Sequence, residues 1–274
     1  MALKEKVMAD ATVNGFKMHY GDQGQGETLL FLHGLGGNSS EWDLQVPFFS
    51  RRFRVVTPDL RGHGQTDPPT TDTYTPFDHA KDVTALLDHL GIDKAWIVGL
   101  SAGGFDTLAT ALTYPDRVRG IVLAATSPYV DKDIVAVGNR WIEIFQKQGM
   151  DAYLDRVVKD IFTLDFFLAH KEEVDKFIES QKHRNLKGIA PSGRGNLGFD
   201  VRHELVKLKI PVLAIHGLND RVVDPAYARR VRQAVVGAEV KLLPDTGHII
   251  NVEKPEEFNA TILDFMVRHG AQAH

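Results

Sequence analysis

Short, uninterrupted runs of apolar residues recur along the chain, separated by glycine, proline or charged positions. These runs are rich in Val, Ile and Leu and show little alternation of apolar and polar residues. Continuous runs of this kind are typical of strands buried on both faces, as in a parallel sheet. The pattern therefore predicts strands at residues 28–32, 54–57, 95–98, 120–124, 212–215 and 240–243.

Residues 7–20 alternate more regularly, and Asn14-Gly15 interrupts them near the middle. Asn-Gly is the dipeptide most typical of a type I′ hairpin turn, because both of its residues tolerate a positive φ. We therefore expect an N-terminal hairpin at one edge of the sheet, which brings the number of predicted strands to eight.

Apolar residues between the predicted strands recur at intervals of three and four, which is the helical period. The clearest helix starts at Thr75-Pro76, an N-cap followed by proline, and ends at Gly91. Further helices are expected near residues 105–112, 225–235 and 256–268. This alternation of strands and helices predicts an α/β fold with a doubly wound, mostly parallel eight-stranded sheet.

Residues 129–205 break the alternation, since they are charged and amphipathic and contain no clear strand. So long an excursion between two strands indicates an inserted helical cap. The expected organisation is a core domain in two parts, 1–128 and 206–274, with a cap at 129–205. Most of the aromatic residues of this segment are expected to form the interior of the cap: Trp141, Phe145, Phe162, Phe166, Phe167 and Phe177.

The segment 99–103 reads Gly-Leu-Ser-Ala-Gly and lies between a predicted strand and a predicted helix. This is the setting in which G-x-S-x-G forms a sharp turn that exposes the serine hydroxyl, with the N-terminus of the following helix beneath it. Small flanking residues let the strand and helix pass closely. Ser101 is therefore the candidate nucleophile, whereas the alternative is a glycine-rich turn that contains an incidental serine.

A serine nucleophile needs a base, and the chain has 12 histidines. His248 follows the last predicted strand in the segment Asp-Thr-Gly-His, at the strand ends where α/β folds bind ligands. His33 and His63 also lie in glycine-rich loops after strands, so they remain rival bases. His248 is preferred because it follows Ser101 in the chain.

The third member of such a triad is an acid that lies between the serine and the histidine in chain order. Asp220 follows the predicted strand 212–215 by a short loop and is the preferred candidate. Asp224 is the alternative, but it directly precedes Pro225 and is better explained as a helix N-cap.

Attack by a serine on a carbonyl group forms a tetrahedral intermediate with a negatively charged oxygen. Two backbone N–H groups are expected to bind this oxyanion. One belongs to Ala102, the residue after the nucleophile. The other is expected in the glycine-rich loop 33–37, where Leu35 is the candidate. These glycines would also permit a tight turn, and both roles are compatible.

Composition narrows the range of chemistry. The 274 residues carry a net charge of −4, which gives no electrostatic basis for nucleic-acid binding. The chain has no cysteine, which excludes disulfides, thiolate nucleophiles and cysteine-ligated metals. The first ten residues do not resemble a signal peptide, and no apolar run is long enough to span a membrane. We therefore expect a cytoplasmic protein with no membrane contact, no metal and no cofactor.

One glycine motif does not fit this picture. Residues 193–198 match G-x-G-x-x-G, but they follow a charged stretch rather than a strand. A dinucleotide site is therefore disfavoured, and the segment is interpreted as a mobile return from the cap.

Five segments together resemble the α/β-hydrolase fold superfamily, in particular its serine esterase and enol-lactone hydrolase branch. They occur in the family's order over nearly the whole chain: LHGLGG (32–37), TPDLRGHGQTD (57–67), GLSAGG (99–104), HGLNDRVVDP (216–225) and DTGHIINVEKP (245–255). The resemblance implies a catalytic triad of Ser101, Asp220 and His248. Serine at position 101 argues against epoxide hydrolases and haloalkane dehalogenases, which place an aspartate there.

The resemblance also implies hydrolysis of a small carboxylic ester or lactone through an acyl-enzyme. Two alternatives stay open: hydrolysis of a C–C bond in a β-diketone-like substrate, and a weakly catalytic small-molecule receptor. The expected partner is a small-molecule substrate, and a homodimer is left open. Three arginines are candidates for binding a substrate carboxylate: Arg61, Arg140 and Arg194.

Overall fold

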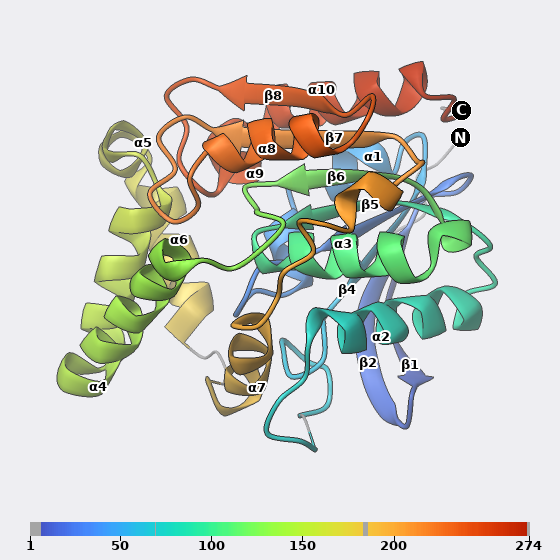
Figure 1. The fold of residues 1–274 in the computed structure, drawn as a ribbon. Coiled ribbons are helices and arrows are strands. Elements are labelled where there is room, and N and C mark those ends of the chain that lie inside the picture. The colour runs from blue at the N-terminus through green and yellow to red at the C-terminus, as the bar shows by residue number, and fades with distance from the viewer. Residues whose placement is uncertain (1–6, 69, 183–185, 273–274) are drawn as a thin grey trace.

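An eight-stranded sheet forms the centre of the molecule, with strand order β1-β2-β4-β3-β5-β6-β7-β8. Figure 1 shows the computed structural model, in which residues 7–68, 70–182 and 186–272 are described. β2 pairs antiparallel with both β1 and β4, and all other neighbours are parallel. The predicted fold class is therefore confirmed. The strands are β1 (Val7–Val13), β2 (Phe16–Gln23), β3 (Thr28–Leu32), β4 (Arg54–Pro58), β5 (Ala95–Leu100), β6 (Val118–Ala124), β7 (Val212–Gly217) and β8 (Glu239–Leu243).

The sheet has a hydrophobic core on each face, which explains the uninterrupted apolar runs. In β3, Leu30 and Leu32 pack into one core, and Leu29 and Phe31 pack into the other. Successive side chains of a strand point to opposite faces, so a strand covered on both sides needs an apolar residue at every position. Each such side chain contributes about 1.5–3 kcal/mol on burial.

The N-terminal hairpin forms as predicted. Asn14 and Gly15 have φ values of 47° and 85°, and they connect a register that ends at Val13 opposite Phe16. Positive φ at both positions is the signature of a type I′ turn. β2 continues to Gln23, beyond the predicted end at Tyr20, because its last residues pair with β4.

Helices cover both faces of the sheet. α2 (Pro76–His89) starts at the predicted Thr75 cap, where Thr75 and Asp78 form a reciprocal capping box. Side chains of α2, α3 (Ala102–Thr113) and α8 (Ala226–Ala234) contribute to one core, and those of α1 (Val46–Phe49) and α10 (Pro255–Arg268) contribute to the other. The remaining short elements of the core are η1 (Ser39–Trp42), η2 (Pro115–Arg117), η3 (Leu205–Lys207) and α9 (Ile250–Glu253).

The chain between β6 and β7 is helical in its described part and lies beyond the carboxyl ends of the strands (Figure 1). It contains α4 (Lys132–Ile161), α5 (Leu164–Ala169), α6 (Lys171–Lys182) and α7 (Leu186–Asn196). α4 is bent at Gly149, where φ is 83°. Although α4 has 30 residues, no helix within the described ranges is long and apolar enough to cross a membrane.

This helical insertion, called the cap below, has its own small core. Val157, Val158, Ile161, Phe162 and Val174 are buried there, with other aromatic side chains packed against them. Of the six aromatic residues expected in the interior, Phe162 is fully enclosed. The others are partly exposed: Trp141, Phe145, Phe166, Phe167 and Phe177.

The two ends of the insertion are held together at its base. Tyr129 and Asp200 form an isolated antiparallel bridge. Beside it, the Val130 N–H donates to Phe199 O at 3.0 Å, and the Val201 N–H donates to Pro128 O at 2.9 Å. The cap therefore leaves and rejoins the core at one place, at residues 128–130 and 199–201.

The interpretation of residues 193–198 as a mobile return is wrong, because residues 193–196 belong to helix α7. Gly195 is required there for packing, since a Cβ at this position would lie 2.0 Å from Tyr74 O. Gly195 therefore serves a close helix contact, whereas a Cβ on Gly193 would make only an ordinary contact with Leu35 and one on Gly198 would meet nothing within 4 Å.

Candidate active site

Ser101 occupies a strained turn between β5 and α3. Its φ of 53° and ψ of −119° fall outside the regions that non-glycine residues normally adopt. Such a conformation costs about 1–3 kcal/mol and persists only where neighbours enforce it. Here the Ser101 N–H donates to Ala124 O at 2.9 Å, and Ser101 O accepts from the hydroxyl of Thr126 at 2.7 Å.

The glycines around Ser101 permit close contact between the strand and helix backbones. A Cβ on Gly99 would lie 2.1 Å from Gly103 O, and a Cβ on Gly103 would lie 2.3 Å from Leu32 O. Real Cβ atoms do not approach backbone oxygen atoms this closely. The glycine-rich sequence at this turn is therefore required by the packing of α3 against the sheet.

Asp220 and His248, which are 28 residues apart in sequence, are brought together. Nδ1 of His248 lies 2.8 Å from Oδ2 of Asp220, and Oδ1 of Asp220 accepts from the N–H groups of Val222 and Val223 at 2.8 and 2.9 Å. His216 adds a further contact, with its Nε2 at 3.2 Å from Oδ2 of Asp220. These contacts fix the orientation of the carboxylate on both of its oxygens.

Asp220 is ionised although it is buried. Burial alone would raise the pKa of the Asp220 carboxyl, but the interactions with His248 and His216 outweigh it and hold that pKa well below its usual range. A buried carboxylate of this kind stabilises positive charge on a neighbouring imidazole.

Asp224, the alternative acid, is exposed and lies at the start of α8. Its Oδ1 accepts from the N–H of Ala226 at 2.8 Å, in the first turn of the helix. This is the helix-capping role that the sequence favoured, and it leaves Asp220 as the acid partner of His248.

His248 is buried, and one of its two ring nitrogens has a hydrogen-bond partner. Its backbone N–H donates to Ile161 O at 2.7 Å, and its Nδ1 bonds Asp220. Nε2 has no hydrogen-bond partner within the described residues and retains contact with solvent. The hydroxyl of Ser101 is in the same situation. Oγ of Ser101 and Nε2 of His248 are therefore free to form hydrogen bonds with a ligand.

His33, one of the two alternative bases, forms hydrogen bonds to the backbone through both of its ring nitrogens. Nδ1 lies 2.8 Å from Gly34 O, and Nε2 accepts from the Leu60 N–H at 3.0 Å. Burial lowers the pKa of His33 to about 4. His33 therefore joins two loops as a neutral imidazole. His63 is also buried, with Nδ1 at 2.9 Å from Arg61 O.

The candidate oxyanion-binding groups lie on two neighbouring segments. Ala102 is the first residue of α3, so its N–H has no partner within the helix. The loop 33–37 passes beside Ser101, since a Cβ on Gly34 would lie 3.4 Å from Ser101 Cβ. The Leu35 N–H has no acceptor among the described residues, whereas the Gly34 N–H donates to Oε2 of Glu41 at 3.1 Å.

The three candidate arginines differ in their availability. Arg61 is paired with Asp82 at 2.6 Å, and its guanidinium lies 4.5 Å from the ring centre of Phe16. Arg194 donates to Asp72 O on the surface, and Arg140 is exposed on α4. Arg61 is therefore already neutralised and is not free to bind a substrate carboxylate.

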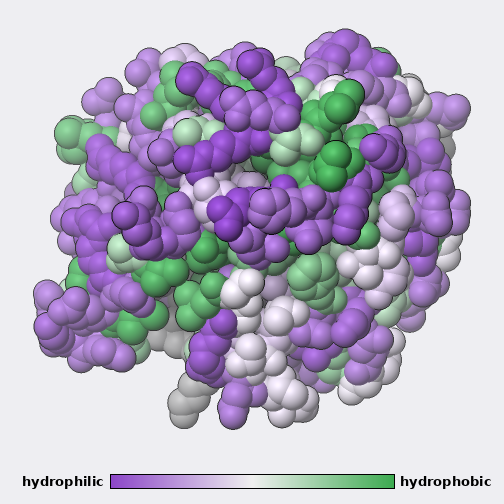
Figure 2. Space-filling view, in the orientation of Figure 1, coloured by the Kyte–Doolittle hydropathy of each residue, from purple (hydrophilic) through white to green (hydrophobic). Residues whose placement is uncertain are grey.

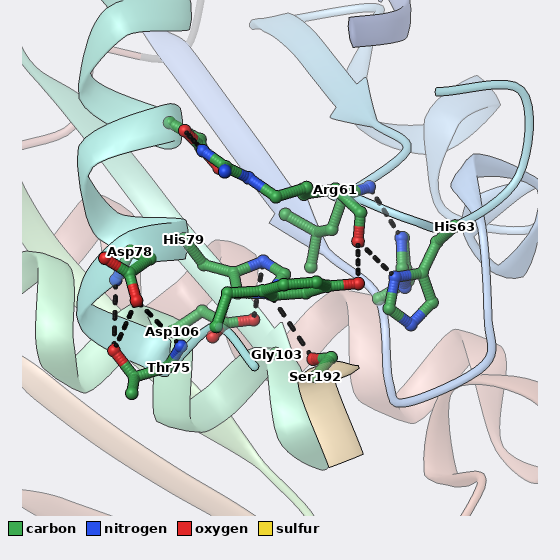
Figure 3. Close-up of polar contacts among 12 residues, drawn as sticks. Arg61, His63, Thr75, Asp78, His79, Gly103, Asp106 and Ser192 are labelled. Atoms are coloured by element: carbon green, nitrogen blue, oxygen red, sulfur yellow. Dashed lines mark hydrogen bonds and ion pairs between the residues drawn. The ribbon is translucent and has the colours of Figure 1, made fainter. Parts of the chain in front are cut away.

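A second serine, histidine and aspartate lie together where α7 contacts the core (Figure 3). Ser192 Oγ lies 3.3 Å from His79 Nε2, but Nδ1 of His79 is 4.0 Å from Asp106. Burial lowers the pKa of His79 to about 3 and raises the pKa of Asp106 well above its usual range. All three side chains are buried, so this cluster joins the cap to the core as neutral groups.

Tyr74 strengthens the same contact. Its hydroxyl donates to Gly188 O at 2.6 Å and lies 3.0 Å from Arg61 O. On the face shown in Figure 2, most exposed residues are hydrophilic, and hydrophobic residues gather in one group at the lower left, on the side of the cap, and in another at the upper right.

Two hollows of the described surface lie far from the motif residues. They are open, have volumes of about 440 and 340 Å³, lie at the amino ends of the strands, opposite to Ser101, and include Glu239 and Glu27 respectively. No group of three His, Asp or Glu side chains in the described ranges converges in the manner of a metal site.

Four residues of this region were missed by sequence reasoning: Glu41, Ile161, His216 and Glu253. His216 and Glu253 lie inside motifs quoted above, so their place in the sequence was a signal, although their contacts were not. Ile161 acts through its backbone carbonyl, for which the sequence carries no signal.

Comparison with known proteins agrees with this geometry. The 3-oxoadipate enol-lactonase 2 of Acinetobacter baylyi is 29% identical over 94% of this chain and 96% of its own length. The 2-hydroxy-6-oxononadienedioate/2-hydroxy-6-oxononatrienedioate hydrolase of Paraburkholderia phymatum is 30% identical over 91% of each chain. The crystal structure of the enol-lactonase from Burkholderia xenovorans LB400 matches with a TM-score of 0.87 and 32% identity, over 94% of this chain and all of that one.

A family model described as the alpha/beta hydrolase fold matches residues 27–255, which include every candidate active-site residue. The strand order, the turn at Ser101 and the Asp220–His248 pair agree with that match. The chain therefore belongs to the α/β-hydrolase fold family.

Proposed function

We propose that the protein is a serine hydrolase that cleaves a small carboxylic ester or lactone, with Ser101, His248 and Asp220 as its triad. The observation that carries the proposal is the buried hydrogen bond between Asp220 and Nδ1 of His248. The other ring nitrogen of His248, Nε2, has no partner among the described residues. A small-molecule substrate and a cytoplasmic location are part of the proposal.

Topology supports a meeting of Ser101 with His248. β5, β6, β7 and β8 are consecutive parallel strands of one sheet. Ser101 follows the carboxyl end of β5, and His248 follows that of β8. Parallel strands end at a common edge, which is where α/β folds bind their ligands. We infer that Oγ of Ser101 and Nε2 of His248 face each other there.

The first half of the reaction forms an acyl-enzyme. His248 Nε2 accepts the Ser101 proton while Oγ attacks the carbonyl carbon of the substrate. Asp220 keeps the remaining imidazole proton on Nδ1 and stabilises the imidazolium that forms. The N–H groups of Leu35 and Ala102 bind the oxyanion of the tetrahedral intermediate, and each such donor contributes about 3 kcal/mol in comparable enzymes.

The second half releases the acid. The imidazolium donates its proton to the leaving alcohol oxygen, and the carbonyl re-forms as the ester of Ser101. Water, deprotonated by His248, then attacks that ester, and Ser101 leaves with the proton returned to it. With a lactone, the leaving alcohol and the acyl group belong to the same molecule.

The substrate class is supported by the enol-lactonase relatives, which match nearly the whole chain at 29% and 32% identity. The partly exposed aromatic residues of the cap favour an apolar portion in the substrate.

C–C bond hydrolysis is a second candidate, because the dienedioate hydrolase of P. phymatum matches at a similar level of 30%. The same serine and histidine could serve that reaction. A small-molecule receptor is the third candidate and would retain the pocket without turnover.

Hydrolysis of p-nitrophenyl acetate by the wild type and by Ser101→Ala separates these functions. We expect turnover by the wild type and its loss in the variant. Activity that survives the substitution would contradict the proposed mechanism, and no turnover by the wild type on any ester, lactone or dienoic diketone would favour the receptor. A panel of short-chain esters, enol-lactones and dienoic diketones then identifies the bond that is cleaved.

A further inference from the structure

The loop that carries His248 is in direct contact with the cap. The backbone N–H of His248 donates to Ile161 O, at the end of α4, at 2.7 Å. The Ile249 N–H donates to the same oxygen at 3.4 Å. Gly247 lies so close that a Cβ there would be 2.5 Å from Ile161 O. The position of this loop therefore depends on the junction between α4 and α5.

Glu253 joins the same two segments through its side chain. One carboxylate oxygen, Oε1, accepts from the Thr163 N–H at 2.8 Å. The other, Oε2, accepts from the Thr163 hydroxyl at 3.0 Å and from the Gly247 N–H at 3.2 Å. The carboxylate therefore binds two segments at once. Gly247 directly precedes His248, and Thr163 lies just after the end of α4.

A carboxylate suits this place better than any other side chain. All three partners are donors, and an ionised carboxylate is an acceptor on both oxygens. Burial raises the pKa of Glu253, and the hydrogen bonds from Thr163 and Gly247 oppose that effect. A glutamine would present an NH₂ group to one of these donors and lose at least one hydrogen bond.

We propose that Glu253 is a positioning residue that fixes the His248 imidazole by holding its loop against the α4–α5 junction of the cap. This inference rests on the proposed function, because it takes His248 as the catalytic base. It follows that this part of the cap contributes to the catalytic rate itself, in addition to any contact with the substrate.

The test compares Glu253→Ala and Glu253→Gln with Glu256→Gln. Glu256 is exposed, three residues away, and serves as the matched control. Hydrolysis of p-nitrophenyl acetate is measured below the melting temperature of every variant. Since a misplacement of about 1 Å costs on the order of 100-fold in rate, we expect kcat to fall about 10- to 100-fold in Glu253→Ala, with KM within about two-fold. Glu253→Gln is expected to lie between that variant and the wild type.

Amide hydrogen exchange gives a second reading that does not depend on turnover. Exchange at Gly247 and His248 is expected to accelerate in both Glu253 variants and to stay unchanged in Glu256→Gln. If Glu253→Ala does not fold, the isosteric Glu253→Gln provides both measurements.

A kcat in the folded Glu253 variants that matches Glu256→Gln would overturn the inference, whatever the exchange rates. A 10- to 100-fold rise in KM with no change in kcat would also overturn the inference, because Glu253 would then act on substrate binding. Failure of the proposed function is recognised separately, by activity that survives Ser101→Ala on an intact Glu253 background.

Discussion

Oδ2 of Asp220 lies 2.8 Å from Nδ1 of His248, while Oδ1 of the same carboxylate is held by two backbone N–H groups. Because both oxygens are engaged, the carboxylate cannot rotate away from the ring. It accepts from Nδ1–H and leaves the lone pair on Nε2, which is the tautomer that a general base requires.

Asp220→Asn is expected to retain the shape of this site and lose most of its activity. The asparagine NH₂ group would donate to Nδ1 and shift the imidazole proton to Nε2, as the same change does in other serine triads, with a loss of about 10⁴-fold in kcat. Asp224→Asn, at the exposed start of α8, is the matched control and should remain within about two-fold of the wild type. Equal activity of the two variants would exclude Asp220 from the triad.

Buried neutral histidines are expected to make the fold sensitive to acid. The pKa of His79 is lowered to about 3, so below its unfolded value of about 6.5 the unfolded chain binds more protons than the folded protein. The contribution to stability is therefore complete above pH 6.5 and is lost as the pH falls toward 3.

This effect is measured by urea unfolding at pH 7 and pH 5. The free energy of unfolding should fall by about 2 kcal/mol more in the wild type than in His79→Gln, at about 1.4 kcal/mol per pH unit. An identical pH dependence in the two proteins would show that His79 is not held neutral.

Gly103→Ala is expected to destabilise the protein by about 3 kcal/mol, because the new methyl group would meet backbone oxygens that cannot move independently. Gly138→Ala is the matched control, since that glycine lies in α4 with open space around it. A helical alanine there should be neutral or stabilise by up to about 1 kcal/mol. Thermal unfolding of the two variants checks the difference, and similar melting temperatures would contradict the close contact between α3 and β3.

Tyr74→Phe should loosen the contact between α7 and the core. The loss of a buried hydrogen bond to Gly188 O costs about 1–2 kcal/mol. We expect faster amide exchange in α7 and a several-fold higher KM, with a smaller change in kcat, because no hydrogen bond joins α7 to the His248 loop among the described residues. Tyr114→Phe is the control, since its hydroxyl makes no hydrogen bond within the described residues. A KM equal to that of the control would show that this contact does not shape the substrate site.

The sequence was most informative where one residue type answers one local requirement. Asn14-Gly15 marked a turn with two positive φ values, and Thr75-Pro76 marked the start of α2. The apolar runs located every strand of the parallel part of the sheet. In β3, β5 and β7 every residue is buried, and burial on both faces favours such an uninterrupted run.

Contacts between distant backbone groups could not be predicted. The bond from the His248 N–H to Ile161 O involves no side chain, so neither residue type signals it. Gly195 looked like part of a loop because glycine is unfavourable in a helix, but its close packing against Tyr74 outweighs that preference. Glu253 was visible as a residue of a motif, whereas its partners depend on how the cap folds.

The most direct measurement is the site of covalent labelling by a fluorophosphonate, which reacts only with a serine that has been activated. After digestion and mass spectrometry, we expect one label per chain, on Ser101, with the rate of labelling reduced at least about 10³-fold in His248→Ala. Label on another residue, or an undiminished rate in His248→Ala, would contradict the claim that His248 activates Ser101.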